Sequence, residues 1–196
     1  MIGSRDFFMV IQENRLEFSF REGVQAVKYD DTDFYREKYQ ILPGSKGVDI
    51  LAVSPSAFWI IEVKDCSDTA QNQDKWRRSY EGMESLSEEI ALKVTHTCAA
   101  LAGAHTLGDR CAAAAELQLA AAALSGAKIP QVKQKLFVIL FLEGDFACYS
   151  RSNKTIYRDI RQRIKRKLKW LNCCVDVVST DTYKSSDYLV RLLPSR

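Results

Sequence analysis

The chain has 196 residues, with 46% hydrophobic and 27% charged side chains and a net charge of +3. These values are those of one soluble domain with its own hydrophobic core. The longest apolar run, residues 136–142, is too short to cross a membrane, and the N-terminal apolar stretch is too short for a secretory signal. The six cysteines include no Cys-x-x-Cys pair, so we expect reduced thiols rather than a zinc site. Residues 1–196 are therefore expected to form a single cytoplasmic domain.

The first third of the chain is predicted to be mostly β-structure. Residues 6–14 fit either a helix or a strand, whereas 16–20 and 24–29 have the β-branched and aromatic residues of strands. Residues 31–39 are expected to form a short helix or turn. Residues 46–53 and 57–64 are expected to pair as a tight β-hairpin about Ser54-Pro55-Ser56.

The remainder alternates between helices and strands. Two helices are predicted over about 80–104 and 110–124, the second with Asp109 as its N-cap and Gly126 and Pro130 as its stop signals. A buried strand at 136–142, a basic helix at about 155–171 and a strand at 175–178 follow. Residues 187–193 fit either a strand or a helix. We expect an α/β fold with a mixed central sheet flanked by helices.

The predicted hairpin places two carboxylates opposite each other. If the chain turns at Pro55 and Ser56, Val53 faces Phe58 and Asp49 faces Glu62, with Cβ atoms about 5 Å apart. Two such carboxylates repel, and burial increases the cost. A divalent cation between them would remove this objection.

Lys64 falls on the same face as Glu62, because side chains alternate along a strand. The other residues on the face of Asp49 are Leu51, Val53, Phe58 and Ile60, and the opposite face carries Val48, Ile50, Ala52, Trp59, Ile61 and Val63. Apolar residues on both faces are typical of central strands that are covered on both sides.

This arrangement resembles the PD-(D/E)xK phosphodiesterase superfamily, which has the fold of many restriction endonucleases. The motif is Val48-Asp49, twelve intervening residues, and Glu62-Val63-Lys64, with Val48 in place of the usual proline. Residues 24–65 also resemble small uncharacterised bacterial nuclease-like proteins. The resemblance implies a restriction-endonuclease-like αβββαβ core, with residues 6–14 as its first helix and 110–124 as an added element.

The resemblance also implies roles for individual residues. Asp49, Glu62 and the backbone carbonyl of Val63 would bind Mg²⁺ or Mn²⁺, and Lys64 would orient the attacking water or stabilise the developing charge. A further acid often comes from the first helix of this fold, and Glu13 and Glu17 are the candidates, with ordinary exposed acids as the alternative. The implied function is metal-dependent hydrolysis of nucleic acid, with DNA the expected polymer.

The segment 151–169 is strongly basic, with nine basic residues against the single acid Asp159. Its isoleucines and leucines form a stripe expected to pack on the sheet. The outward face is expected to bind the phosphate backbone of nucleic acid, with simple solvation as the alternative. This face carries Lys154, Arg158, Arg161, Lys165 and Lys169.

Three other interpretations stay open. The hairpin could be a surface ribbon with an ordinary Glu/Lys pair, or the chain could be a non-catalytic nucleic-acid-binding or assembly module that keeps the nuclease fold. A hydrolase of a small phosphorylated ligand is the third. The sequence leaves a homodimer or a protein partner equally open.

Overall fold

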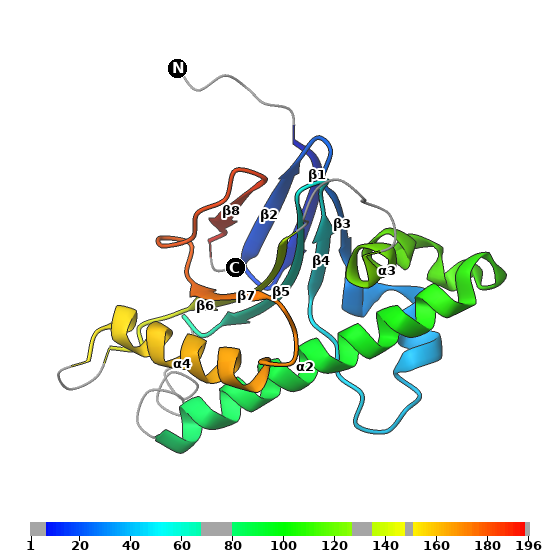
Figure 1. The fold of residues 1–196 in the computed structure, drawn as a ribbon. Coiled ribbons are helices and arrows are strands. Elements are labelled where there is room, and N and C mark those ends of the chain that lie inside the picture. The colour runs from blue at the N-terminus through cyan, green and yellow to red at the C-terminus, as the bar shows by residue number, and fades with distance from the viewer. Residues whose placement is uncertain (1–6, 68–79, 127–134, 148–150, 195–196) are drawn as a thin grey trace.

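The computed structural model describes residues 7–67, 80–126, 135–147 and 151–194, which form two β-sheets and a layer of helices (Figure 1). The larger sheet has five strands in the order β3-β4-β5-β6-β7. Strands β3, β4 and β5 are antiparallel neighbours, whereas β5, β6 and β7 run parallel, so the sheet is mixed as expected. Their bounds are Gln25–Lys28 for β3, Ile50–Val53 for β4, Ala57–Asp65 for β5, Lys135–Glu143 for β6 and Cys174–Val178 for β7.

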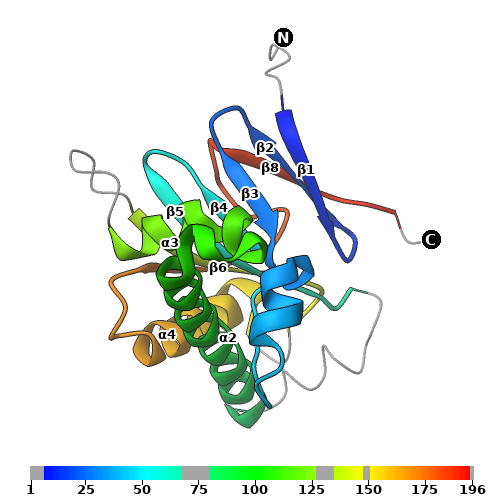
Figure 2. The same ribbon diagram turned by 90° about the vertical axis from the view of Figure 1, so that its right-hand side faces the viewer.

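Helices cover one face of the five-stranded sheet (Figure 2). These are α2 (Tyr80–Leu107), α3 (Gln118–Ser125) and α4 (Asn153–Lys167). The other face packs against a smaller antiparallel sheet, ordered β1 (Phe7–Glu13), β2 (Leu16–Arg21) and β8 (Tyr188–Leu192). Each interface is a separate hydrophobic cluster, so β4 and β5 are central strands covered on both sides, as expected.

The hairpin has the predicted register. Val53 pairs with Phe58 and Ile50 with Ile61. The turn is closed by Ser54, whose amide donates to the Ala57 carbonyl at 2.8 Å and whose hydroxyl accepts from the Ala57 amide at 3.2 Å. Every residue of β4 and the first seven of β5 are buried, which excludes the surface-ribbon interpretation.

Two predictions for the helices are wrong. Residues 7–13 form β1, so the first helix of an αβββαβ core does not come from this stretch. The predicted helix over 110–124 is only half α-helical: Ala112–Leu117 is a 3-10 helix, and α3 begins at Gln118. Asp109 lies in the 3-10 turn Gly108–Arg110 and is not the N-cap of a helix, contrary to the prediction. The positive φ of Gly108 and the extended conformation of Cys111 interrupt the helical backbone between α2 and residue 112. Gly126, in the left-handed conformation, ends α3 as expected.

The basic helix α4 begins at Ser152, whose side chain accepts a hydrogen bond from the Thr155 amide. It ends at Lys167, one turn earlier than predicted, and residues 188–192 form a strand rather than a helix. The apolar stripe lies in the core between α4 and the sheet, as expected, and consists of Ile156, Ile160, Ile164 and Leu168. Within the described ranges, no helix combines the length and hydrophobicity needed to span a membrane.

Candidate functional site: a buried carboxylate and lysine cluster

Asp49 and Glu62 lie together at the end of the hairpin, and both are buried, with 7% and 2% of their surface exposed. Asp49 stands directly before β4, and its amide donates to the Ile61 carbonyl at 3.2 Å. Its carboxylate oxygen Oδ2 accepts a hydrogen bond of 2.6 Å from the Val63 amide. This second bond orients the Asp49 side chain across β5, beside Glu62.

The segment before Asp49 is fixed by α2. The Lys46 amide donates to His96 Nδ1 at 3.0 Å, and the Val48 amide donates to Thr97 Oγ1 at 3.2 Å. Strict alternation predicts that Val48 lies on the opposite face, with Ile50. Val48 instead packs in the hydrophobic cluster on the helix side of the sheet. Strand alternation does not apply here, because residues 45–49 are not part of a strand.

Strand geometry puts the Val63 carbonyl on the side of β5 where Asp49 lies. In an extended strand, the amide and carbonyl groups of one residue point to the same edge. Since the Val63 amide binds Asp49, the Val63 carbonyl faces the same side of β5. Two carboxylates and one backbone carbonyl are thus grouped at the end of the hairpin.

Two lysines balance the carboxylates. Lys64 Nζ lies 3.1 Å from Glu62 Oε1 and 2.8 Å from Glu89 Oε1 on α2. Lys93, one turn further along α2, lies 2.6 Å from Glu62 Oε1 and 3.6 Å from Asp49 Oδ1. The Lys93 ammonium therefore contacts both carboxylates, the position for which the sequence suggested a divalent cation.

Glu89 and Lys93 were missed by the sequence analysis. Their signal was the spacing Glu-x-x-x-Lys on the helix that follows the hairpin, which puts both side chains on one helix face. That spacing is common on exposed helices, so only the packing of α2 against β5 gives it meaning.

Burial dominates the ionisation of the carboxylates. Burial, with the nearby Asp49 charge, raises the pKa of Glu62 to about 7, despite the opposing effects of Lys93 and Lys64. Burial also raises the pKa of Asp49, against the influence of Lys93 and the Val63 amide. Burial alone would lower the pKa of Lys64 and of Lys93, but Glu62 and its neighbouring carboxylates outweigh it, so both ammonium pKa values are raised and both lysines stay charged at neutral pH.

One oxygen of the cluster lacks a partner. Glu62 Oε2 is buried and accepts no hydrogen bond from the described part of the chain, although Oε1 is contacted by both lysines. A buried unsatisfied carboxylate oxygen is costly, so a ligand that binds it would be favoured. Within the described ranges, no group of three or more Asp, Glu, His or Cys side chains is arranged to hold a metal ion. A metal here would need the Val63 carbonyl and water besides Asp49 and Glu62.

Of the two candidates for a further acid, Glu13 lies nearer the cluster. Its charge contributes to raising the pKa of Asp49, and its Oε2 is 3.0 Å from Lys28 Nζ. Glu17 instead pairs with Arg191 of β8 at 2.7 Å. Asp30, which the sequence analysis did not single out, has its pKa raised to about 6 by burial and by Asp49 and Glu13.

A pocket of about 450 Å³ opens beside the cluster. Lys93 and Glu89 line it from α2, and Arg36, Lys46 and Asp30 line it from the segment between β3 and β4. Lys93 both lines the pocket and contacts the carboxylates, so it connects the pocket to the buried cluster.

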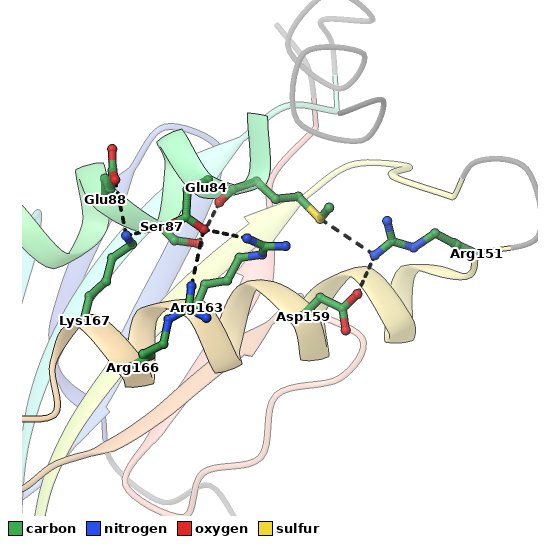
Figure 3. A network of polar contacts seen from close by, with 9 residues as sticks. Glu84, Ser87, Glu88, Arg151, Asp159, Arg163, Arg166 and Lys167 are labelled. Atoms are coloured by element: carbon green, nitrogen blue, oxygen red, sulfur yellow. Dashed lines mark hydrogen bonds and ion pairs between the residues drawn. The ribbon is translucent and has the colours of Figure 1, made fainter. Parts of the chain in front are cut away.

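Three basic residues of the segment 151–169 are paired with carboxylates and do not belong to its outward face. Arg163 and Lys167 turn toward α2 and each lie 2.5 Å from Glu84, while Arg151 pairs with Asp159 at 2.5 Å (Figure 3). Arg163 and Lys167 thus join α4 to α2, and Arg151 joins the segment before α4 to the helix. The predicted phosphate-binding residues point elsewhere: Lys154, Arg158, Lys165 and Lys169 are exposed, and Arg161 is half-buried, 3.7 Å from Asp176. Lys154, Arg158 and Arg161 line a groove of about 960 Å³ beside β7.

The comparisons with known proteins give one result. No match was found among curated proteins or among solved structures. The model of a family of unknown function, DUF6661, matches residues 32–192, a range that contains the whole carboxylate and lysine cluster and α4. The chain therefore belongs to the family DUF6661.

Proposed function

We propose that the protein is a metal-dependent nuclease of the PD-(D/E)xK type that hydrolyses phosphodiester bonds in nucleic acid, with DNA the expected polymer. The observation that carries the proposal is the pair Asp49 and Glu62, buried at adjacent positions, with Glu62 Oε2 unsatisfied among the described residues. The element order supports it, since a three-stranded meander is followed by parallel strands with helical crossovers: β3, β4, β5, α2, α3, β6, α4 and β7, with α3 as the added element. A restriction-endonuclease-like core, lacking its usual first helix, fits this order.

The residues present fit Mg²⁺ or Mn²⁺. Asp49, Glu62 and the Val63 carbonyl offer hard oxygen ligands and leave positions for water and phosphate. The metal would supply an activated water and offset the charge that develops on the phosphate. Lys64, held between Glu62 and Glu89 and protonated at neutral pH, would be a fixed cation beside the reacting phosphate. Lys93 would have to release the carboxylates and could then contact the phosphate from the pocket.

The direct test is incubation of the purified protein with plasmid, single-stranded DNA and RNA, each with Mg²⁺, Mn²⁺ or EDTA. We expect cleavage that EDTA abolishes. Asp49→Ala and Glu62→Ala should abolish cleavage and weaken Mn²⁺ binding in calorimetry. Lys64→Ala should keep the metal but lose at least about a hundredfold in turnover. An Asp49→Ala variant that cleaves as well as the parent would overturn the assignment.

Glu13 and Glu17 provide a matched pair of carboxylates on neighbouring strands. If Glu13 contributes to the metal site, Glu13→Ala should weaken Mn²⁺ binding, whereas Glu17→Ala should leave it unchanged. Equal effects of the two substitutions would remove Glu13 from the site.

A specific contact favours the second candidate, a non-catalytic nucleic-acid-binding module. Lys93 already supplies a cation to both Asp49 and Glu62, which allows the cluster to be stable without metal. This module would bind nucleic acid in EDTA and show neither cleavage nor a Mn²⁺ heat signal. The nuclease proposal requires both cleavage and a Mn²⁺ heat signal.

The phosphate-binding face can be tested separately. Arg158, Arg161 and Lys165 lie away from the buried isoleucine stripe, so changing all three to Gln should preserve folding. The slope of log affinity against log salt for duplex DNA should flatten by about two units or more, since each lost phosphate contact removes a bit under one unit. An unchanged slope would mean that this face is only solvated.

A further inference from the structure

A second feature of α4 lies beyond its phosphate-binding face. Trp170 lies three residues after the last residue of α4, Lys167, and has 59% of its surface exposed. A large aromatic side chain in water leaves much apolar area unburied, and Trp is enriched at binding interfaces. Trp59, by contrast, is 5% exposed and packs against Phe137 in the core.

The backbone holds Trp170 in a fixed position. Leu168 is buried in the core, and its amide donates to Ile164 at 2.9 Å. The Leu171 amide donates to Leu168 at 2.9 Å, and the Cys173 amide to Leu171 at 2.8 Å. The backbone at Trp170 thus belongs to a hydrogen-bonded turn anchored on both sides, so little backbone entropy is lost when a ligand covers the indole.

The surroundings of Trp170 are basic and concave. Trp170 lines a pocket of about 530 Å³ together with Lys165, Arg166, Lys169 and Asn172. Lys165, Arg166 and Lys169 are exposed. Arg166 lies 3.7 Å from Glu84, so Lys165 and Lys169 are the main charges offered to an anionic ligand. Lys165 on α4 and Lys169, two residues after its end, both belong to the proposed phosphate-binding face, so the pocket is continuous with that face.

We propose that Trp170 is a stacking platform for an unpaired nucleobase, and that the protein binds single-stranded nucleic acid at this pocket. An exposed aromatic ring flanked by cations is the combination that single-strand-binding surfaces use, because every base has a face to stack and every nucleotide a phosphate to pair. A base within a duplex is already stacked on both faces and cannot use the indole. This inference rests on the proposed nucleic-acid-binding function and narrows it to strands with unpaired bases.

The test measures binding of the full chain in EDTA to a 20-nucleotide thymidine strand, the corresponding uridine strand and a 20-base-pair duplex. Trp170→Ala should weaken single-strand binding by about tenfold to a hundredfold, as the loss of one stacked base predicts. Duplex affinity should change by less than about twofold, since duplex binding depends on phosphate contacts. In the parent, a base stacked on Trp170 should quench the fluorescence of its indole. Trp170→Phe should keep most of the single-strand affinity but lose this part of the quenching. The two single strands show whether DNA or RNA is preferred.

Leu189→Ala is the matched control, because Leu189 is 49% exposed but lies on β8, away from α4. It should leave single-strand affinity unchanged, and all variants should melt at the parent temperature. The proposal is overturned if the parent does not bind single strands, if Trp170→Ala binds them as the parent does, or if duplex and single-strand affinities fall equally. Because these measurements exclude metal, they are independent of whether Asp49 supports cleavage.

Discussion

Replacing Lys93 by Met tests the charge balance of the buried cluster. The substitution keeps the length of the side chain but removes the ammonium that lies 2.6 Å from Glu62 and 3.6 Å from Asp49. Removing one partner of a buried ion pair costs about 3 to 5 kcal/mol. Lys64 still contacts Glu62 at 3.1 Å and compensates in part. We therefore expect Lys93→Met to lower the free energy of unfolding in EDTA at pH 8 by about 2 kcal/mol.

The loss should depend on pH. Burial already raises the pKa of Glu62 to about 7, and loss of Lys93 raises it further. At pH 6 Glu62 in the variant is protonated and no longer needs a cation, so the difference from the parent should fall below about 1 kcal/mol. Chemical denaturation at the two pH values measures both quantities.

Metal binding should change in the opposite direction. If Mn²⁺ binds at Asp49 and Glu62 as proposed, it would have to displace Lys93 in the parent but not in Lys93→Met. We therefore expect at least about tenfold tighter binding to the variant by calorimetry, which corresponds to about 1.4 kcal/mol. Mn²⁺ at a concentration a hundredfold above its Kd should add about 2.7 kcal/mol to the free energy of unfolding, which is enough to restore the stability of the variant to that of the parent. Lys165→Met, a control at an exposed site on α4, should change neither quantity. If Lys93→Met is as stable as the parent in EDTA, or binds Mn²⁺ no more tightly, the reasoning is refuted.

Three further predictions concern the same region. Asp49→Asn in EDTA should melt at the parent temperature or above, because the amide oxygen can keep the hydrogen bond from the Val63 amide while the repulsion with Glu62 disappears. A large decrease of the melting temperature in calorimetry would show that the charge of Asp49 is needed for stability. The pKa of Glu62 is raised from 4.5 to about 7, so between these pH values the folded protein binds a proton that the unfolded chain releases. The protonated carboxyl therefore stabilises the folded state fully below pH 4.5, and this stabilisation should be lost as the pH rises through 7. The difference in unfolding free energy between the parent and Glu62→Gln should therefore shift by about 3 kcal/mol across this window, and a flat difference would contradict the burial argument. Gly47→Ala should destabilise the protein by about 1 to 3 kcal/mol, because the added Cβ would lie 2.7 Å from the ring of Tyr35 and 2.8 Å from that of Tyr29; a variant as stable as the parent in urea would show that these rings move freely.

The register of the hairpin was determined by local sequence. Ser54-Pro55-Ser56 sets the turn, and the apolar residues on both arms require burial on both faces, so only one pairing fits. The same local logic placed the buried stripe of α4, because its isoleucines recur at the helical period. The register brings Asp49, directly before β4, close to Glu62, but the Val63 amide and the contacts of α2 with Lys46 and Val48 set its final position.

Where the local pattern allowed two structures, tertiary packing decided. Residues 7–13 suit a strand or a helix, and they form a strand because β2 offers a partner edge. Residues 112–117 are rich in alanine, yet they do not continue α2 as an α-helix: the backbone is broken at Gly108 and Cys111, and a separate 3-10 helix follows. Helix propensity is a weak preference, and chain breaks and packing override it.

The charge balance of the site was invisible in the sequence. Lys93 is 31 residues from Glu62 and 44 from Asp49, and its contact with both depends on how α2 crosses β5. The raised pKa of Glu62 depends likewise on the two layers that bury it. Side-chain types and strand register are encoded locally, whereas the cation that a buried carboxylate meets is set by the packing of distant elements, because electrostatic interactions in the interior depend on distance and burial rather than on separation along the chain.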